Sequence, residues 1–187
     1  MSILSIIKTY TQAPERRLVM LEPFLPYDPY VRRMVMSQEV ASFVLGPWSS
    51  ADAEKRCARV RADLDAFVTG DVVSICLVPF EANDERFALL RQERFGVFDV
   101  RCYDPRPNIR ILGGFAEQDW FVALTLHPRS IPVPWIPRVP LGCGRSAEWA
   151  SAIHETKEAW RDLFGDISPR TGSTPDVFLT NYFCKGT

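Results

Sequence analysis

Arginine and histidine side chains gather near the ends of three predicted strands in the second half of the chain. Arg101, Arg110, His127 and Arg129 stand inside these strands or just after them. Arginine presents a flat fork of donors that fits phosphate oxygens, and histidine titrates near neutral pH. If these side chains converge at one sheet end, the arginines would stabilise a charged transition state and His127 would be a general acid. The alternative is separate surface ion pairs, with Asp99 pairing with Arg101 across the strand pleat.

A second chemical candidate is the stretch Gly142-Cys143-Gly144-Arg145-Ser146, which precedes a predicted helix. Backbone N–H groups at the start of a helix favour anions, and a neighbouring arginine favours the thiolate form of a cysteine. Cys143 and Arg145 are therefore candidates for a reactive thiol or an anion site. The alternative interpretation is a flexible loop that needs its glycines only to turn.

The remaining histidine, His154, stands four residues before Glu158 in a predicted helix, so both side chains would share one face. The pair could hold a metal or exchange protons, but a solvated helix face is the favoured interpretation. No sequence motif for a zinc site, a phosphate-binding loop, a dinucleotide fold or a nucleophile elbow occurs. The five cysteines stand far apart, and Cys57 and Cys76 fall in apolar patterns typical of core thiols. We therefore expect neither a metal nor a cofactor.

A proline-rich loop is predicted at residues 127–145, immediately after the last of the three strands. Apolar side chains alternate with its prolines, namely Ile131, Val133, Trp135, Ile136 and Val139. Closely spaced prolines favour an extended, stiff segment, and exposed apolar residues on it would form a surface for a protein partner. The alternative is that the loop packs over the sheet.

Composition limits the classes of protein that remain. A chain of 187 residues that is 47% hydrophobic can bury the core of one domain. The net charge of -1 does not suit a sequence-independent polyanion binder, so RNA stays an alternative partner that would need a local basic patch. No apolar run approaches the length of a membrane span, and Ile3–Ile7 is too short for a signal peptide. We expect a cytoplasmic protein that does not enter a membrane, of unknown oligomeric state.

Hydrophobic periodicity and capping residues predict an α+β fold. We expect a mostly antiparallel sheet that contains a three-strand meander, with the helices packed on one face. Predicted helices cover residues 28–45, 52–69, 83–94, 146–164 and 174–183. Predicted strands cover residues 72–80, 95–103, 108–115 and 119–126. Residues 1–187 form a single domain in this prediction, with an extended N-terminal arm at 1–27 and a C-terminal tail at 166–187.

Residues 72–160 resemble the RelE/HigB-like toxins of bacterial toxin–antitoxin modules. The segments that carry the resemblance are Gly96-Val97-Phe98-Asp99-Val100-Arg101, Asn108-Ile109-Arg110-Ile111 and Phe121-Val122-Ala123-Leu124. The resemblance implies a meander with an arginine in its first strand, followed by a final helix, and an enzyme that cleaves messenger RNA. Arg101 and Arg110 match the arginines of that pattern. His127-Pro128-Arg129 stands where the family has lysines.

Two functions are therefore carried forward from the sequence. The favoured one is a non-catalytic protein that binds a partner through the proline-rich loop, with Trp135 as an anchor. The alternative is a RelE-like ribonuclease or another phosphate-handling enzyme that uses the arginines at one sheet end.

Overall fold

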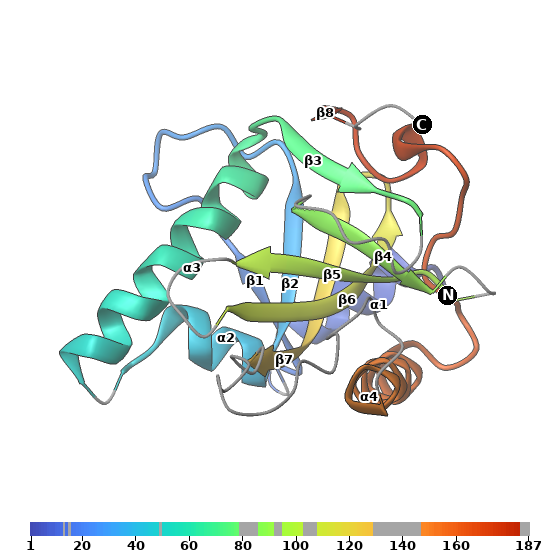
Figure 1. Ribbon diagram of the computed structural model, residues 1–187, viewed down its shortest axis with the longest axis horizontal. Coiled ribbons are helices and arrows are strands. Elements are labelled where there is room, and N and C mark those ends of the chain that lie inside the picture. The colour runs from blue at the N-terminus through green and yellow to red at the C-terminus, as the bar shows by residue number, and fades with distance from the viewer. Residues whose placement is uncertain are drawn as a thin grey trace, which may run out of the picture.

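An eight-stranded sheet forms the centre of the protein in a computed structural model (Figure 1). The structure describes residues 1–12, 14, 16–48, 50–78, 86–91, 95–102, 108–128 and 147–183. Within these residues the strand order is β1-β2-β7-β6-β5-β4-β3-β8. The strands are β1 (Leu18–Leu21), β2 (Arg33–Ser37), β3 (Val73–Cys76), β4 (Phe87–Arg91), β5 (Val97–Cys102), β6 (Ile109–Glu117), β7 (Trp120–Pro128) and β8 (Tyr182–Phe183). The helices are α1 (Ile3–Thr11), α2 (Gln38–Leu45), α3 (Ala51–Thr69), α4 (Ala147–Phe164) and the short 3-10 helix η1 (Pro175–Val177).

The combination of helices and sheet confirms the α+β class, but the sheet is mixed rather than mostly antiparallel. Each of β4, β5 and β6 runs antiparallel to the strand that follows it, and β1 runs antiparallel to β2. In contrast, β2 pairs in parallel with β7, and β3 pairs in parallel with both β4 and β8. Parallel neighbours are joined by long crossover connections, so local periodicity cannot show which distant strand becomes the neighbour.

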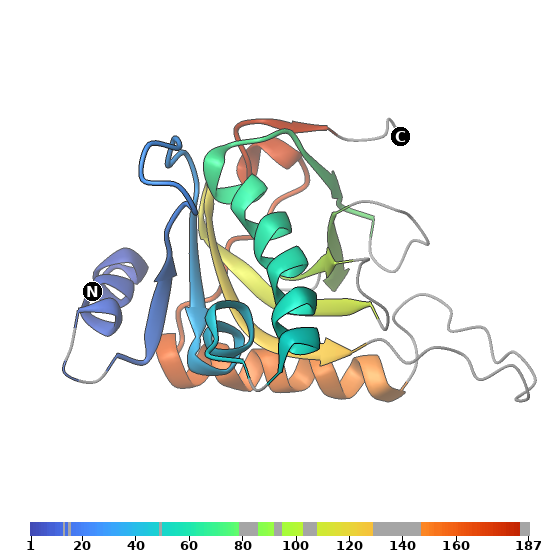
Figure 2. The same cartoon turned by 90° about the vertical axis from the view of Figure 1, so that its left-hand side faces the viewer.

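Helices cover both faces of the sheet, so the prediction that they gather on one face is wrong. α2 and α3 bury Val40 and Leu64 against one face, together with Phe98 of β5. α1 and α4 bury Ile7 and Trp160 in a separate cluster on the opposite face. Figures 1 and 2 show α3 and α4 on different sides of the strands. The central strands are therefore buried on both faces.

The predicted helix at 52–69 is confirmed as α3. The Ser50 hydroxyl accepts a hydrogen bond from the Ala53 N–H at 3.2 Å, which satisfies a free donor of the first turn. Gly70 ends the helix with a φ of 95°, a left-handed conformation that glycine adopts without strain. Val60 and Leu64 are fully buried in the core, as the apolar stripe predicts.

The N-terminal part of the chain differs from the prediction. The segment 1–27 is not an extended arm, because it contains α1, capped by Ser2, and the edge strand β1. The predicted helix at 28–45 is instead strand β2 followed directly by α2. The Ser37 hydroxyl accepts a hydrogen bond from the Val40 N–H and starts α2 in the middle of that segment. Val35 and Met36 fit both a strand and a helix spacing, so periodicity alone cannot decide between them.

Two later segments also correct the prediction. The helix predicted at 83–94 is wrong for residues 87–91, which form strand β4. The predicted C-terminal tail is part of the fold, because Phe178 and Leu179 are buried in the main core and β8 pairs with β3. The predicted helix at 174–183 is reduced to η1.

Gly113 marks an irregularity in the β6–β7 pairing, as the Gly113-Gly114 dipeptide suggests in the sequence. The pairing register shifts between Leu112 and Gly113. A Cβ atom at Gly113 would lie 1.9 Å from the Val122 carbonyl oxygen, so only glycine allows the two backbones to approach this closely.

Arg32 is fully buried and ties together segments that are far apart in the sequence. Its guanidinium donates to the carbonyl oxygens of Phe67 (3.1 Å), Asp71 (2.9 Å) and Asn181 (2.5 Å). Its Nε atom lies 3.3 Å from a carboxylate oxygen of Asp119, in the turn between β6 and β7. The end of α3, that turn and the residue before β8 therefore share one cation.

Candidate functional site

The strand register places three of the predicted site residues in one row across the sheet. Arg101 of β5 is the partner of Arg110 of β6, and Arg110 is the partner of His127 of β7. Their side chains lie on the α4 face, because Val97 and Leu112 share that alternation and pack with α4. Arg101, Arg110 and His127 are thus brought together, whereas Arg129 lies outside the described residues.

Asp99 joins the two arginines in a buried ionic triad. Arg110 Nη1 donates to Asp99 Oδ2 at 2.7 Å, and Arg101 Nε donates to the same oxygen at 3.1 Å. The predicted pairing of Asp99 with Arg101 is therefore present, but it is buried rather than on the surface. Arg101 and Arg110 are only 8% and 4% exposed. Burial of three ionised groups removes their hydration, so this triad is not an efficient source of stability.

His127 is the accessible member of the row, with a quarter of its side chain exposed. Its Nε2 atom lies 3.1 Å from the Thr125 hydroxyl, which lies 2.7 Å from the Thr156 hydroxyl of α4. Nε2 also lies 4.0 Å from a carboxylate oxygen of Glu155. An imidazole held by the Thr125 hydroxyl, in the same row as two arginines, can exchange a proton with a negatively charged ligand.

Glu39, in the first turn of α2, is electrostatically coupled to this cluster. Partial burial raises the pKa of the Glu39 carboxyl, the Glu155 carboxylate raises it further, and His127 opposes them by lowering it. Folding therefore disfavours the ionised form of Glu39. Protonated Glu39 therefore contributes to the free energy of unfolding. This contribution is fully present below the unfolded pKa of about 4.3 and is lost as pH rises through the raised folded pKa.

The Glu39→Gln variant is expected to be slightly more stable than the wild type at pH 7, with no gain below about pH 4. The gain in Tm should not exceed about 2 °C, because solvent screens an exposed carboxylate. Thermal unfolding followed by circular dichroism between pH 3 and pH 8 measures it. Glu54→Gln, in the first turn of α3, is the control and should show no gain. A Glu39→Gln gain that grows toward acid pH would contradict this coupling.

Other predicted site residues are not part of the row. The candidate interaction residues Ile131, Val133, Trp135, Ile136 and Val139 lie outside the described residues, as do Cys143 and Arg145. His154 is exposed on α4, and Glu158 pairs with Arg161 of the same helix. Within the described ranges, no group of three or more histidine, cysteine, aspartate or glutamate side chains could hold a metal ion.

The described cysteines are core thiols. Cys57, Cys76 and Cys102 are buried, as the apolar patterns around the first two predict. Burial raises the pKa of the Cys102 thiol to about 12, and the carboxylate of Asp63 adds to this shift. Cys102 therefore stays protonated and unreactive at neutral pH.

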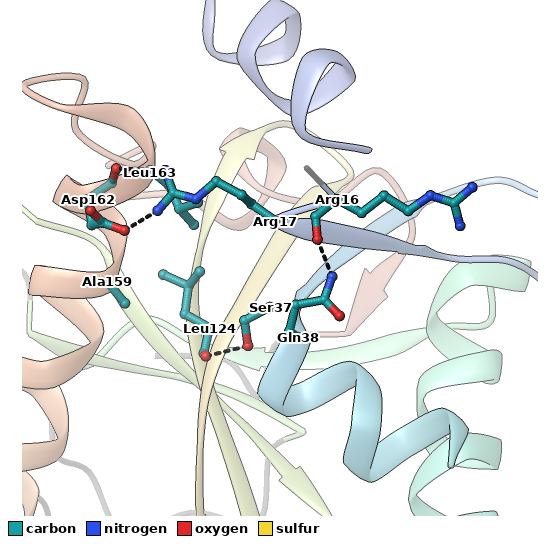
Figure 3. Close-up of a pocket in the computed structure, with 8 residues that line it drawn as sticks. All are labelled: Arg16, Arg17, Ser37, Gln38, Leu124, Ala159, Asp162 and Leu163. Atoms are coloured by element: carbon teal, nitrogen blue, oxygen red, sulfur yellow. Dashed lines mark hydrogen bonds and ion pairs between the residues drawn. The ribbon is translucent and has the colours of Figure 1, made fainter. Parts of the chain in front are cut away.

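An open cleft of about 460 Å³ lies between α4, β7, the start of α2 and the residues before β1 (Figure 3). It is lined by Arg16, Arg17, Ser37, Gln38, Leu124, Ala159, Asp162 and Leu163. Arg17 reaches across it to pair with Asp162. Glu155 stands one helical turn before Ala159, so α4 leads from the cleft toward His127.

Comparisons with known proteins add no relative: no protein-family model, curated protein or solved structure matches this chain. Among the helices that the structure describes, none is long and apolar enough to cross a membrane. The site must therefore be interpreted from its own chemistry.

Proposed function

We propose that the protein is a phosphate-handling enzyme that cleaves RNA, with His127 as the proton-transfer group. The strand register is the observation that supports this best, because it brings Arg101, Arg110 and His127 from three strands into one row. The resemblance to RelE/HigB-like toxins favours the same chemistry, since Arg101 and Arg110 are the residues that match that pattern.

The buried arginines suit a catalytic role better than a structural one. Apolar residues of similar size usually stabilise a core as well as a buried ion pair does, so ionic groups in such a place are candidates for function. The positive charge of the two arginines, fixed in a low-dielectric setting in the same row as His127, favours negative charge that develops on phosphate oxygens bound at His127. His127 is exposed enough to reach a ligand, while Asp99 holds the two arginines in place.

The His127→Gln variant is expected to lose activity while it stays folded. Wild-type protein, expressed from an inducible promoter in bacteria, should stop growth and pulse-labelled translation. Purified wild-type protein should cleave a labelled single-stranded RNA, and His127→Gln should lower the rate at least about 100-fold. His154→Gln is the matched control, because it changes the other histidine, which lies on an exposed face of α4. It should behave as the wild type.

Two results would overturn this proposal. Normal growth and intact RNA with the wild-type protein would remove the enzymatic function. Equal activity of His127→Gln and His154→Gln would show that His127 takes no part in the chemistry.

A second candidate function is non-catalytic binding of a protein partner, which an exposed apolar surface favours. Phe24 and Tyr27 are 71% and 97% exposed, and Leu25 and Leu45 lie beside them with about half of their surface exposed. An adjoining pocket of about 360 Å³ is lined by Met20, Glu22, Pro23, Phe24, Val44, Leu45, Trp48 and Arg61. Exposed aromatic residues next to an apolar pocket are typical of binding surfaces. The proline-rich loop with Trp135 stays a prediction for the same function.

The double variant Phe24→Ala/Tyr27→Ala is expected to weaken a protein partner's binding about 30-fold or more, because exposed aromatic anchors dominate such interfaces. The partner would be captured from the native host and its affinity measured with purified components. Val72→Ala, at another exposed apolar position, is the control and should bind as the wild type. Equal binding by all three proteins would exclude this surface.

A further inference from the structure

A chain of hydrogen bonds leads from His127 into helix α4. His127 Nε2 lies 3.1 Å from Thr125 Oγ1, and Thr125 Oγ1 lies 2.7 Å from Thr156 Oγ1. Thr156 Oγ1 lies 2.8 Å from the Ala152 carbonyl oxygen, one helical turn earlier. Thr125 and Thr156 are almost completely buried, so the contact between their hydroxyls excludes water.

Each of these three hydrogen bonds requires one donated proton. The number of protons available determines which group is the donor in each bond. The Ala152 carbonyl oxygen can only accept, so the Thr156 hydroxyl must donate to it. Thr156 has no second proton, so the Thr125 hydroxyl must donate to Thr156. The Thr125 proton is then committed, and the remaining contact requires a proton on His127 Nε2.

We infer that Thr125 and Thr156 are positioning residues that hold neutral His127 in the tautomer protonated at Nε2. The Glu155 carboxylate, 4.0 Å from Nε2, favours a proton on the same nitrogen. Within the described part of the chain no hydrogen bond to Nδ1 is made. Nδ1 is therefore the nitrogen that accepts a proton.

This assignment deepens the proposed function and rests on it for its catalytic meaning. A neutral imidazole that carries no proton on Nδ1 is a general base at that nitrogen. In RNA cleavage, Nδ1 takes the proton of the attacking hydroxyl as its oxygen bonds to phosphorus. The bond from phosphorus to the leaving oxygen breaks, and the imidazolium returns that proton to the leaving oxygen. No proton is gained or lost overall.

Nitrogen-15 NMR of the histidine side chains tests the assignment directly, because the chain contains only two histidines. At a pH where both imidazoles are neutral, His127 should be protonated at Nε2 more completely than exposed His154, which gives the reference ratio. Thr156→Val keeps the buried shape but removes the acceptor for Thr125. The Thr125 hydroxyl can then turn and donate to Nε2, so the His127 population should shift toward the tautomer protonated at Nδ1. Thr156→Ser should restore the wild-type spectrum.

Activity measurements separate this inference from the proposed function. Thr156→Val should lower kcat at least about 10-fold with little change in KM, as expected for a base in the wrong tautomer, and Thr156→Ser should recover it. The inference would be overturned if His127 of the wild type were protonated mainly at Nδ1. It would also be overturned if Thr156→Val left the tautomer population of His127 unchanged. If the tautomer responds as expected but His127→Gln stays active, the tautomer assignment stands and the proposed enzymatic function fails.

Discussion

Replacing Asp99 with alanine is expected to lower the free energy of unfolding by about 3–5 kcal/mol. The carboxylate accepts hydrogen bonds from Arg101 and Arg110, and all three side chains are almost fully buried. Removing the carboxylate takes away the ionic partner that the two buried arginines share, and removing one side of a buried ion pair is strongly destabilising. Urea denaturation followed by circular dichroism measures the loss.

A matched variant separates burial from charge. Asp162→Ala breaks an ion pair with Arg17 in which the Asp162 side chain is largely exposed, and it should change stability by no more than about 1 kcal/mol. If Asp99→Ala lowers the free energy of unfolding as little as this control does, the triad behaves like an ion pair that is exposed to solvent.

Replacing the whole triad tests its purpose. The triple variant Asp99→Val/Arg101→Leu/Arg110→Leu removes all three charges of the triad together. Its stability should equal or exceed that of the wild type by up to about 4 kcal/mol, because buried ion pairs are often less stabilising than apolar packing. Its activity on RNA should nevertheless be lost. A stable and active triple variant would exclude the arginines from the proposed chemistry.

The second large effect is expected at Arg32, where methionine should lower the free energy of unfolding by about 3–5 kcal/mol. Methionine fills a similar volume but has no donor for the carbonyl oxygens of Phe67, Asp71 and Asn181. A buried acceptor that loses its donor costs about 1–3 kcal/mol, and three acceptors are affected, two of them only partly buried. Urea denaturation gives the total loss, and hydrogen exchange should show faster opening of β8, which follows Asn181.

The neighbouring Arg33 provides the control for Arg32. Arg33 stacks over the Tyr30 ring at 3.7 Å and is half-buried, so Arg33→Met should cost about 1 kcal/mol. Equal losses for the two variants, or an unchanged exchange rate in β8, would show that Arg32 does not tie the C-terminal residues to the core.

Local signals predicted the elements that carry their own start and stop residues. α3 has Ser50 at its start, Gly70 at its end and an apolar stripe between them, so tertiary contacts only reinforce what the sequence favours. Strand β4 has no such signals, and its Phe87-Ala88-Leu89-Leu90 run fits a buried strand or a helix equally well. Pairing with its neighbours in the sheet, β3 and β5, makes this segment a strand.

The part of the site that lies within one strand could be predicted from the alternation of side chains along that strand. Alternation puts Asp99 and Arg101 on one strand face, and it correctly pairs them. The alignment of Arg101 with Arg110 and His127 depends on pairing register, which the irregularity at Gly113 also affects. Thr125 and Thr156 gave no signal, because they stand 31 residues apart and meet only when α4 docks on the sheet.

The parallel pairing of β2 with β7 has a consequence for synthesis on the ribosome. Arg33 and its partner Trp120 are 87 positions apart (120 − 33), and at about 5–20 residues per second this distance takes roughly 4–17 s to translate. During that interval β1 and β2 exist only as a strand pair, which is marginally stable by itself. One edge of β2, with the apolar Met34, Val35 and Met36, has no strand beside it until β7 emerges. The nascent chain therefore exposes an aggregation-prone edge for several seconds, and folding chaperones that bind extended apolar segments should engage it there.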